Sequence, residues 1–193
     1  MKRRTLLRHT LLTSLACFTS CKSESPLPVL SQVPSFAFTD QTGQALATKD
    51  LSGTPWVAAF MFTRCPSICP KITREMRKLQ VRARSEGLSV HWISFSVDPD
   101  NDTPQVLATY AKKYEADTSN WSFLTGDFRV MQKTAEEGFK IGVSGTANGS
   151  EPHYGISHGS HLVLVDTQGM IRGYYRTTDE QAQQQLLKDL ARL

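Results

Sequence analysis

The stretch GTPWVAAFMFTRCPSICPKITREMRKLQ, residues 53–80, contains the pattern that decides the fold. Residues 57–62 form a continuous apolar run of strand length, which is typical of a strand buried on both faces of a sheet. After TRCPSICP, apolar residues recur every three to four positions among charged ones, which predicts a helix from about Cys69 to Arg84. Cys65 and Cys69 therefore lie where a buried strand passes into a helix.

Strands and helices alternate through the rest of the chain. Apolar patterning predicts strands at residues 89–97 and 121–126, and two strands within residues 161–175 that are joined by a turn at residues 166–169. Start signals predict helices over residues 103–114, 127–137 and 179–190, with residues 139–143 extending the second of them. This order predicts an α/β protein with a thioredoxin-like three-layer sandwich, in which helices flank a central mixed β-sheet.

The composition is that of a soluble globular protein. The chain has 193 residues, of which 39% are hydrophobic and 21% charged, and these values exclude collagen-like, disordered and multi-span membrane proteins. The net charge of +4 comes from four basic residues in the first twenty positions, which hold no acidic residue, and the rest has 18 basic and 18 acidic residues. A chain body without net charge argues against nucleic acid as a partner.

The N-terminus has the features of an export signal. A basic start followed by an apolar run at residues 11–18 predicts a signal peptide over residues 1–20. The sequence FTSC looks like a bacterial lipobox, so Cys21 is a candidate for lipidation, with an unlipidated signal, a retained anchor and a twin-arginine signal as alternatives. We expect export to the bacterial cell envelope or periplasm. There, residues 21–34 would form a flexible tether to the membrane, and residues 35–193 the thioredoxin-like domain.

Cys65 and Cys69 are the two cysteines outside this N-terminal segment. They are too few for a disulfide framework, so they are either a functional pair or inert core thiols, and the proline after each favours an exposed turn. The C-x-x-x-C spacing places both sulfurs near the positive end of the helix dipole, and Arg64 adds a positive charge. We therefore expect the pKa of both thiols to be lowered. Thiolates suit Cu(I), a histidine ligand would also allow Cu(II), and a closed zinc site would need four protein ligands.

Three of the five histidines cluster within nine residues. His153, His158 and His161 lie on a loop and at the entry to the strand that follows it, which we expect to run beside the central strand and close to the cysteines. His161 begins the apolar alternation, so its side chain has a structural alternative at the strand edge. His9 lies in the signal and His91 begins a strand, and we expect neither to act at the site.

Four motifs, in this order, resemble the Sco/SenC family of copper-binding, thioredoxin-like proteins: TRCPSICP, SVDPDNDTP, TGDFRVMQKTAEEGF and HGSHLVLVDTQG. The resemblance implies that Cys65, Cys69 and His158 are the ligands of one copper ion, as Cu(I) or Cu(II). It also implies a role in maturing the dinuclear copper centre of cytochrome c oxidase.

The resemblance has two departures and one further residue of interest. No acidic residue stands between the cysteines, where the family often has one, and Ser157 precedes His158 where some members have an aspartate. Both changes remove negative charge near the site. Asp98 matches a position that the family places near the site, where it orients a ligand or a partner or else only caps its loop.

Two functions of different classes follow. The first is a metallochaperone that passes copper from Cys65, Cys69 and His158 to a copper-accepting subunit of cytochrome c oxidase. The second is a thiol-disulfide oxidoreductase whose cysteine pair reduces that subunit and is itself kept reduced by thiol reductant proteins. The histidine favours the carrier, since a reductase has no use for it. A peroxidase is the weakest reading, because Thr63 stands one position too close to Cys65.

Overall fold

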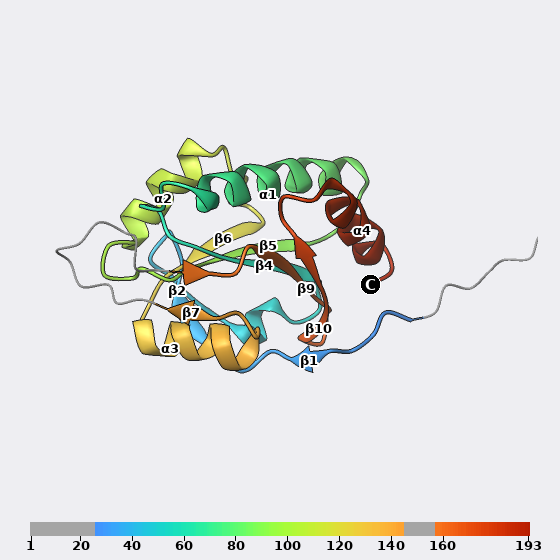
Figure 1. The fold of residues 1–193 in the computed structure, drawn as a ribbon, viewed down its shortest axis with the longest axis horizontal. Helices are drawn as coiled ribbons and strands as arrows, with labels where there is room; N and C mark the ends of the chain where they lie inside the picture. Colours follow the sequence, from blue (N-terminus) through green and yellow to red (C-terminus); the bar gives the residue numbers. More distant parts are fainter. Residues whose placement is uncertain (1–25, 145–156) are drawn as a thin grey trace, which may run out of the picture.

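The computed structural model describes residues 26–144 and 157–193, and Figure 1 shows its layers. A six-stranded sheet has the order β1-β10-β9-β4-β5-β6. Helices α1 and α4 lie above the sheet in Figure 1 and α3 lies below it. The predicted three-layer α/β sandwich with a mixed sheet is confirmed.

The elements have the following bounds. The strands of the large sheet are β1 (Ser31–Gln32), β4 (Trp56–Met61), β5 (His91–Ser96), β6 (Trp121–Leu124), β9 (His161–Val165) and β10 (Met170–Arg176). Two small sheets contain β2 (Ala37–Thr39) with β3 (Ala45–Ala47), and β7 (Val143–Ser144) with β8 (Ser157–His158). The helices are α1 (Ile68–Ser85), α2 (Pro104–Lys113), α3 (Phe128–Lys133) and α4 (Glu180–Leu190). A 3-10 helix spans Thr48–Leu51, and a π-helical turn, Thr134–Gly138, continues α3.

Strand β4 is the centre of the sheet, and all six of its residues are buried. It pairs in parallel with β5 and antiparallel with β9. Phe60 stacks on Phe95 of β5 with ring centroids 5.0 Å apart, and Phe139 meets Phe60 edge-on. Burial on both faces explains why the strand is a continuous apolar run rather than an alternating one.

The carboxyl end of β4 is the edge of the sheet where the cysteines lie. Because β5 is parallel to β4, it ends at the same edge, and because β9 is antiparallel, it begins there. The loop after β5 and the segment leading into β9 therefore converge on the turn between β4 and α1. The opposite edge carries the β9–β10 turn, since Val165 at the end of β9 pairs with Trp56 at the start of β4.

Two expectations about the chain were wrong. Residues 139–143 do not extend α3, because the backbone at Lys140 is left-handed, with φ of 54°, and Val143 begins β7 instead. Residues 31–34 are not part of a free tether, since β1 pairs with β10 and Val33 is buried. The sequence pattern did not predict β1 because a strand of two residues is too short to show alternation.

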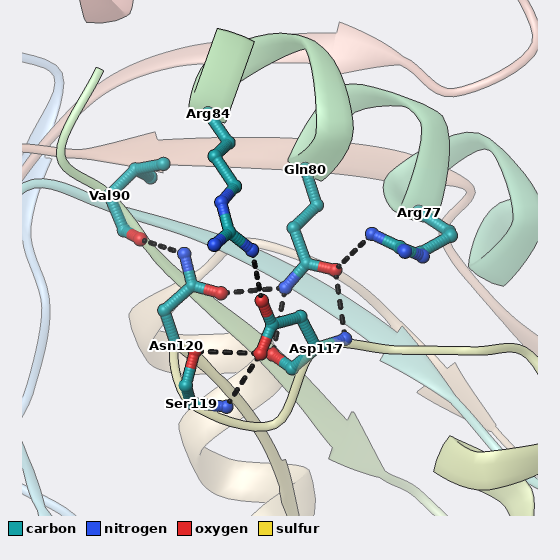
Figure 2. Close-up of polar contacts among 7 residues, drawn as sticks. All are labelled: Arg77, Gln80, Arg84, Val90, Asp117, Ser119 and Asn120. Atoms are coloured by element: carbon teal, nitrogen blue, oxygen red, sulfur yellow. Dashed lines mark hydrogen bonds and ion pairs between the residues drawn. The ribbon is translucent and has the colours of Figure 1, made fainter. Parts of the chain in front are cut away.

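The buried side-chain amide of Gln80, in the second half of α1, forms hydrogen bonds with the loop before β6 (Figure 2). Gln80 Nε2 donates to the carbonyl of Asp117 at 2.9 Å and to Asn120 Oδ1 at 2.7 Å. Its Oε1 accepts from Asp117 N at 3.1 Å and from Arg77 Nη1 at 3.2 Å. All four hydrogen-bonding positions of this side chain are filled, so α1 is fixed in position on the sheet.

Within residues 26–144 and 157–193, no helix combines the length and the apolar character needed to cross a membrane.

Candidate metal centre

The turn between β4 and α1 carries both cysteines. The Cys65 amide donates to the carbonyl of Phe62 at 3.3 Å, which closes the turn, and Cys69 lies in the first turn of α1. The two sulfurs are not joined in a disulfide in this structure. Pro66 and Ser67 are exposed as predicted, but Cys65 is only 7% exposed and Cys69 is fully buried. The cysteine-bearing turn is thus exposed at its tip and buried at its two sulfur-bearing residues.

The two thiols differ in acidity, although the sequence predicted a lowered pKa for both. Burial is the largest influence on Cys65 and opposes its ionisation. The backbone N–H groups of Cys69 and Ser67 and the side chains of both residues point at its sulfur, and together they lower its pKa. These donors belong to the start of α1, which has no side-chain cap of its own.

Cys69 shows the opposite behaviour. Burial raises its pKa far above the ordinary value. A hydrogen bond with the Phe62 backbone opposes this, while the nearby Cys65 sulfur and the Asp102 carboxylate raise the pKa further. The neutral Cys69 thiol donates a hydrogen bond to the Cys65 sulfur, which favours ionisation of Cys65 and disfavours that of Cys69. Of the two thiols, Cys65 therefore loses its proton more readily, and Cys69 keeps its own.

Arg64 does not act on the thiols as a free charge. Its Nη2 and Nε donate to Asp98 Oδ2 at 2.8 and 3.0 Å, so the guanidinium is neutralised by a fully buried carboxylate. Asp98 Oδ1 also accepts from Asn101 at 2.8 Å. Asp98 therefore contacts the residue next to Cys65 rather than either sulfur, and it also caps its own loop.

A second buried carboxylate, Asp102, holds Thr63. Its Oδ2 accepts from the Thr63 amide at 3.0 Å and from Ser96 Oγ at 2.5 Å, and its Oδ1 accepts from the Thr63 hydroxyl. Burial raises the pKa of Asp102, opposed by its hydrogen bonds from Ser96 and Thr63. The loop between β5 and α2 thus contacts both residues that precede Cys65.

The first turn of α1 is supported from α2. Thr73 Oγ1 donates to the Cys69 carbonyl at 3.0 Å and lies 2.9 Å from the Tyr110 hydroxyl. Because the single Thr73 hydrogen is used on Cys69, the Tyr110 hydroxyl is the donor to Thr73. Cys69 therefore has a support from α2 that Cys65 does not share, while the backbone of Phe62 bonds to both cysteines.

The predicted third ligand, His158, lies in β8, whose backbone pairs with Val143 of β7. Its strand leads into β9, which begins at the edge of the sheet where the cysteines lie. His161 is half-buried at the start of β9, and His153 lies outside the described residues, as do the signal peptide and Cys21. In the described part of the chain, no three histidine, cysteine, aspartate or glutamate side chains form a group able to hold a metal.

Comparisons with known proteins identify the family. A family model described as SCO1/SenC matches residues 25–193. The chain belongs to this family. A SCO1/SenC family lipoprotein from Bacillus anthracis is 38% identical in its crystal structure, with a TM-score of 0.78, over 84% of this chain and 95% of that one.

Two further structures of the family are informative. BsSco, described as having a disulfide switch and as a member of the Sco family of cytochrome c oxidase assembly proteins, is 32% identical with a TM-score of 0.76, over 86% of this chain and 95% of that one. ScoI of Bradyrhizobium japonicum, solved with copper bound, is 25% identical with a TM-score of 0.65, over 84% of this chain and 99% of that one. The fold of the SCO1/SenC chain described here is thus that of its relatives.

The sequence analysis did not identify Asp102, Thr63 or Tyr110 as residues that hold the cysteine-bearing turn and the start of α1. One signal was available for the first of them. SVDPDNDTP follows a strand parallel and adjacent to β4, so its carboxylates had to lie at the same sheet edge as the cysteines. No sequence pattern indicates that Tyr110 on α2 supports Cys69.

Proposed function

We propose that the protein is a copper carrier that holds one copper ion through Cys65, Cys69 and His158 and delivers it to the copper-accepting subunit of cytochrome c oxidase. The observation that supports this most directly is the cysteine pair itself. Two soft sulfur donors lie at the sheet edge from which β9 starts, and one of them is stabilised as a thiolate. The relative from Bradyrhizobium japonicum was solved with copper bound, which supports copper as the metal.

The donor set fits copper better than zinc. Within the described residues the turn supplies two thiols, Cys65 and Cys69. Two thiolates and one imidazole match the preference of copper for soft ligands, whereas a structural zinc site takes four protein ligands.

Loading is expected to begin at Cys65. Its sulfur already receives the N–H groups at the start of α1 and needs little further stabilisation as an anion. Cys69 holds its proton more firmly, so binding of copper by both sulfurs releases that proton and depends on pH. Delivery then proceeds by exchange of the protein's ligands for those of the accepting subunit.

A thiol-disulfide oxidoreductase remains the second candidate, and one observation favours it. One acidic thiol beside a buried protonated one is the arrangement of an attacking and a resolving cysteine. The disulfide switch described for BsSco points the same way. In this role the pair would reduce the cysteines of the accepting subunit and be restored by thiol reductant proteins.

We also propose export and membrane attachment. Residues 1–20 would be removed as a signal peptide and Cys21 would carry the lipid, as the lipoprotein relative from Bacillus anthracis suggests. The protein would then work in the cell envelope, tethered to the membrane.

The deciding experiment measures copper transfer and disulfide reduction on the same protein. The protein, reduced with a phosphine and kept anaerobic, is exposed to Cu(I) or Cu(II), desalted and analysed for copper per chain. It is then mixed with the copper-free accepting subunit in its dithiol and disulfide forms. We expect about one copper per chain and its transfer to the dithiol form. Failure to retain copper, with reduction of the disulfide form, would replace the carrier by the reductase.

A further inference from the structure

The loop between β5 and α2 holds the cysteine-bearing turn from outside α1. Asp102 and Asp98 are both fully buried, and they contact the consecutive residues Thr63 and Arg64. The loop is itself fixed, because the amide of Val97 donates to the carbonyl of Met61 at 2.9 Å and that of Asp102 to Asp98 at 2.9 Å. The end of β5 thus forms a rigid support for the end of β4.

Of the two carboxylates, Asp102 is the one that binds the backbone of the turn as well as a side chain. Three donors converge on its carboxylate, namely the amide and hydroxyl of Thr63 and the hydroxyl of Ser96. Arg64, the residue held by Asp98, is about one-third exposed, so that ion pair is open to solvent and weaker. Asp102 is therefore the main link between this loop and the turn.

Each cysteine consequently has one support that the other lacks. The turn that carries Cys65 is held by Asp102 through Thr63, whereas Cys69 is held by α1 and, through Thr73, by Tyr110. The separation of the two sulfurs depends on both supports. Loss of the Asp102 support would let the Cys65 sulfur sample positions away from Cys69 and would reduce the advantage of holding both in place.

We propose that Asp102 is a positioning residue of the cysteine pair, which fixes Cys65 relative to Cys69 and thereby sets how readily the two form a disulfide and how tightly they hold Cu(I). The statement on Cu(I) rests on the function proposed above, whereas the statement on the disulfide does not. Asp102 positions Cys65 through its hydrogen bonds to Thr63, and this role is separate from the effect of its charge on the pKa of Cys69.

Substitutions can separate the effect of the hydrogen bonds of Asp102 from the effect of its charge. In Asp102→Asn the amide oxygen can accept from the Thr63 amide and from Ser96, while the amide nitrogen donates to the Thr63 hydroxyl, which is free to rotate. The hydrogen bonds survive without the charge. Asp102→Ala removes them all, and Thr63→Val removes the hydroxyl contact at a half-buried position while preserving side-chain shape.

The control is a buried carboxylate at the other edge of the sheet. Asp166, in the β9–β10 turn, accepts from the amides of Gln168 and Met170 and from Arg172, each at 2.9 Å. Asp166→Ala removes a comparable set of hydrogen bonds, so it should lower stability without contacting the cysteine turn. It therefore reports what destabilisation alone does.

The experiment equilibrates each full-length variant, free of metal, with mixtures of reduced and oxidised dithiothreitol and measures the fraction of disulfide. Reduced dithiothreitol gives two electrons and two protons, the Cys65–Cys69 bond breaks to two thiols, and dithiothreitol closes to its own disulfide. We expect Asp102→Ala to shift this equilibrium toward the dithiol about tenfold, equivalent to about 30 mV. Thr63→Val should shift it about threefold and Asp102→Asn less than about twofold.

Each other outcome is informative. Equal shifts in Asp102→Asn and Asp102→Ala would assign the effect to charge, and an equal shift in Asp166→Ala would assign it to general destabilisation; either overturns the proposal. If Asp102→Ala does not fold, an unshifted Thr63→Val overturns it instead. Cu(I) retention against a chelator should fall in the same order. If the unmodified protein retains no Cu(I) while the disulfide shifts hold, the carrier function fails and the positioning role stands.

Discussion

The N-terminal or near end of helix α1 and its C-terminal or far end both make polar contacts, but with different results. At the far end, Gln80 fills all of its hydrogen-bonding positions and joins α1 to the loop before β6 (Figure 2). At the near end, the first N–H groups of the helix point at the Cys65 sulfur instead of at a capping side chain. The buried Gln80 amide, whose partners all belong to the fold, adds stability. The start of the helix instead stabilises the Cys65 thiolate, which is the form that binds metal and exchanges disulfides.

The first prediction tests the near end and has the largest expected effect. Cys65→Ser or Cys69→Ser should weaken Cu(I) retention about a thousandfold, because each removes one of two soft ligands. Copper per chain after competition with a Cu(I) chelator measures this. Ser67→Ala is the matched control, since it removes a hydroxyl 3.7 Å from the Cys65 sulfur but no ligand. Retention by either serine variant at the level of the unmodified protein would show that the site lies elsewhere.

A substitution at the far end of α1 should lower the stability of the protein but leave copper binding unchanged. Gln80→Leu leaves the amide and carbonyl of Asp117 and the side chain of Asn120 without their partner, so the free energy of unfolding should fall by about 3 kcal/mol. Chemical denaturation measures the loss. Val81→Ala, at an exposed position of the same helix, should change it by less than about 0.5 kcal/mol. A change in copper per chain in the folded Gln80→Leu protein would contradict the separation of the two ends.

The two thiols at the near end should differ in reactivity. The pKa of Cys65 is lowered, so its thiolate fraction, and with it its alkylation rate, rises at lower pH than for an ordinary cysteine and levels off sooner. The pKa of Cys69 is raised and its side chain is buried, so it should react about a hundredfold more slowly between about pH 6 and pH 9. Mass spectrometry after timed iodoacetamide labelling gives both rates. Equal rates would remove the asymmetry on which the order of loading depends.

The proposed third ligand, His158, should matter more for Cu(II) binding than for Cu(I) binding. His158→Ala should weaken Cu(II) binding about tenfold and Cu(I) binding less than about threefold, because two thiolates can hold Cu(I) alone whereas Cu(II) needs further nitrogen or oxygen ligands. The visible absorption of the Cu(II) complex follows the loss. His161→Ala is the control at the start of β9 and should have little effect. The reverse ranking would move the ligand from His158 to His161.

The smallest effect is expected for the surface pair at the far end. Arg84 donates to Asp117 at 2.9 Å, but its side chain is 81% exposed. Arg84→Ala should therefore lower the unfolding free energy by less than about 0.5 kcal/mol, and the loss should shrink further at high salt. Thermal unfolding at two salt concentrations measures it. A loss as large as that of Gln80→Leu would mean that the exposed ion pair, and not the buried amide, fastens α1.

Local patterns were enough for the regular elements around the site. The apolar run of β4 and the helical spacing after it placed Cys65 and Cys69 at a strand-to-helix junction, and the bounds of α1 differ from the prediction by one residue at each end. Side-chain caps at Thr103, Asp127 and Asp179 begin the next three helices as predicted. These features depend on neighbours within a few residues, which is the range that periodicity and capping signals report.

Features that depend on distant residues were missed or wrong. The strand β1 exists only because β10 pairs with it, and its two residues carry no alternation. The left-handed backbone at Lys140 ends the predicted extension of α3, although lysine itself favours helices. Such outcomes are decided by what the rest of the fold offers, not by local preference.

By itself, the sequence determined the α/β class, the family and the position of the cysteine pair, because each is written in residues close together along the chain. Only the tertiary structure decided that Cys65 is acidic and Cys69 is not, and that Arg64 is neutralised by Asp98. Only the tertiary structure placed Asp102 behind the cysteine turn, since the Thr63 contact joins residues 39 positions apart. Burial and hydrogen bonding between distant segments set pKa values and side-chain positions, and they follow from how strands β4 and β5 end at one edge of the sheet.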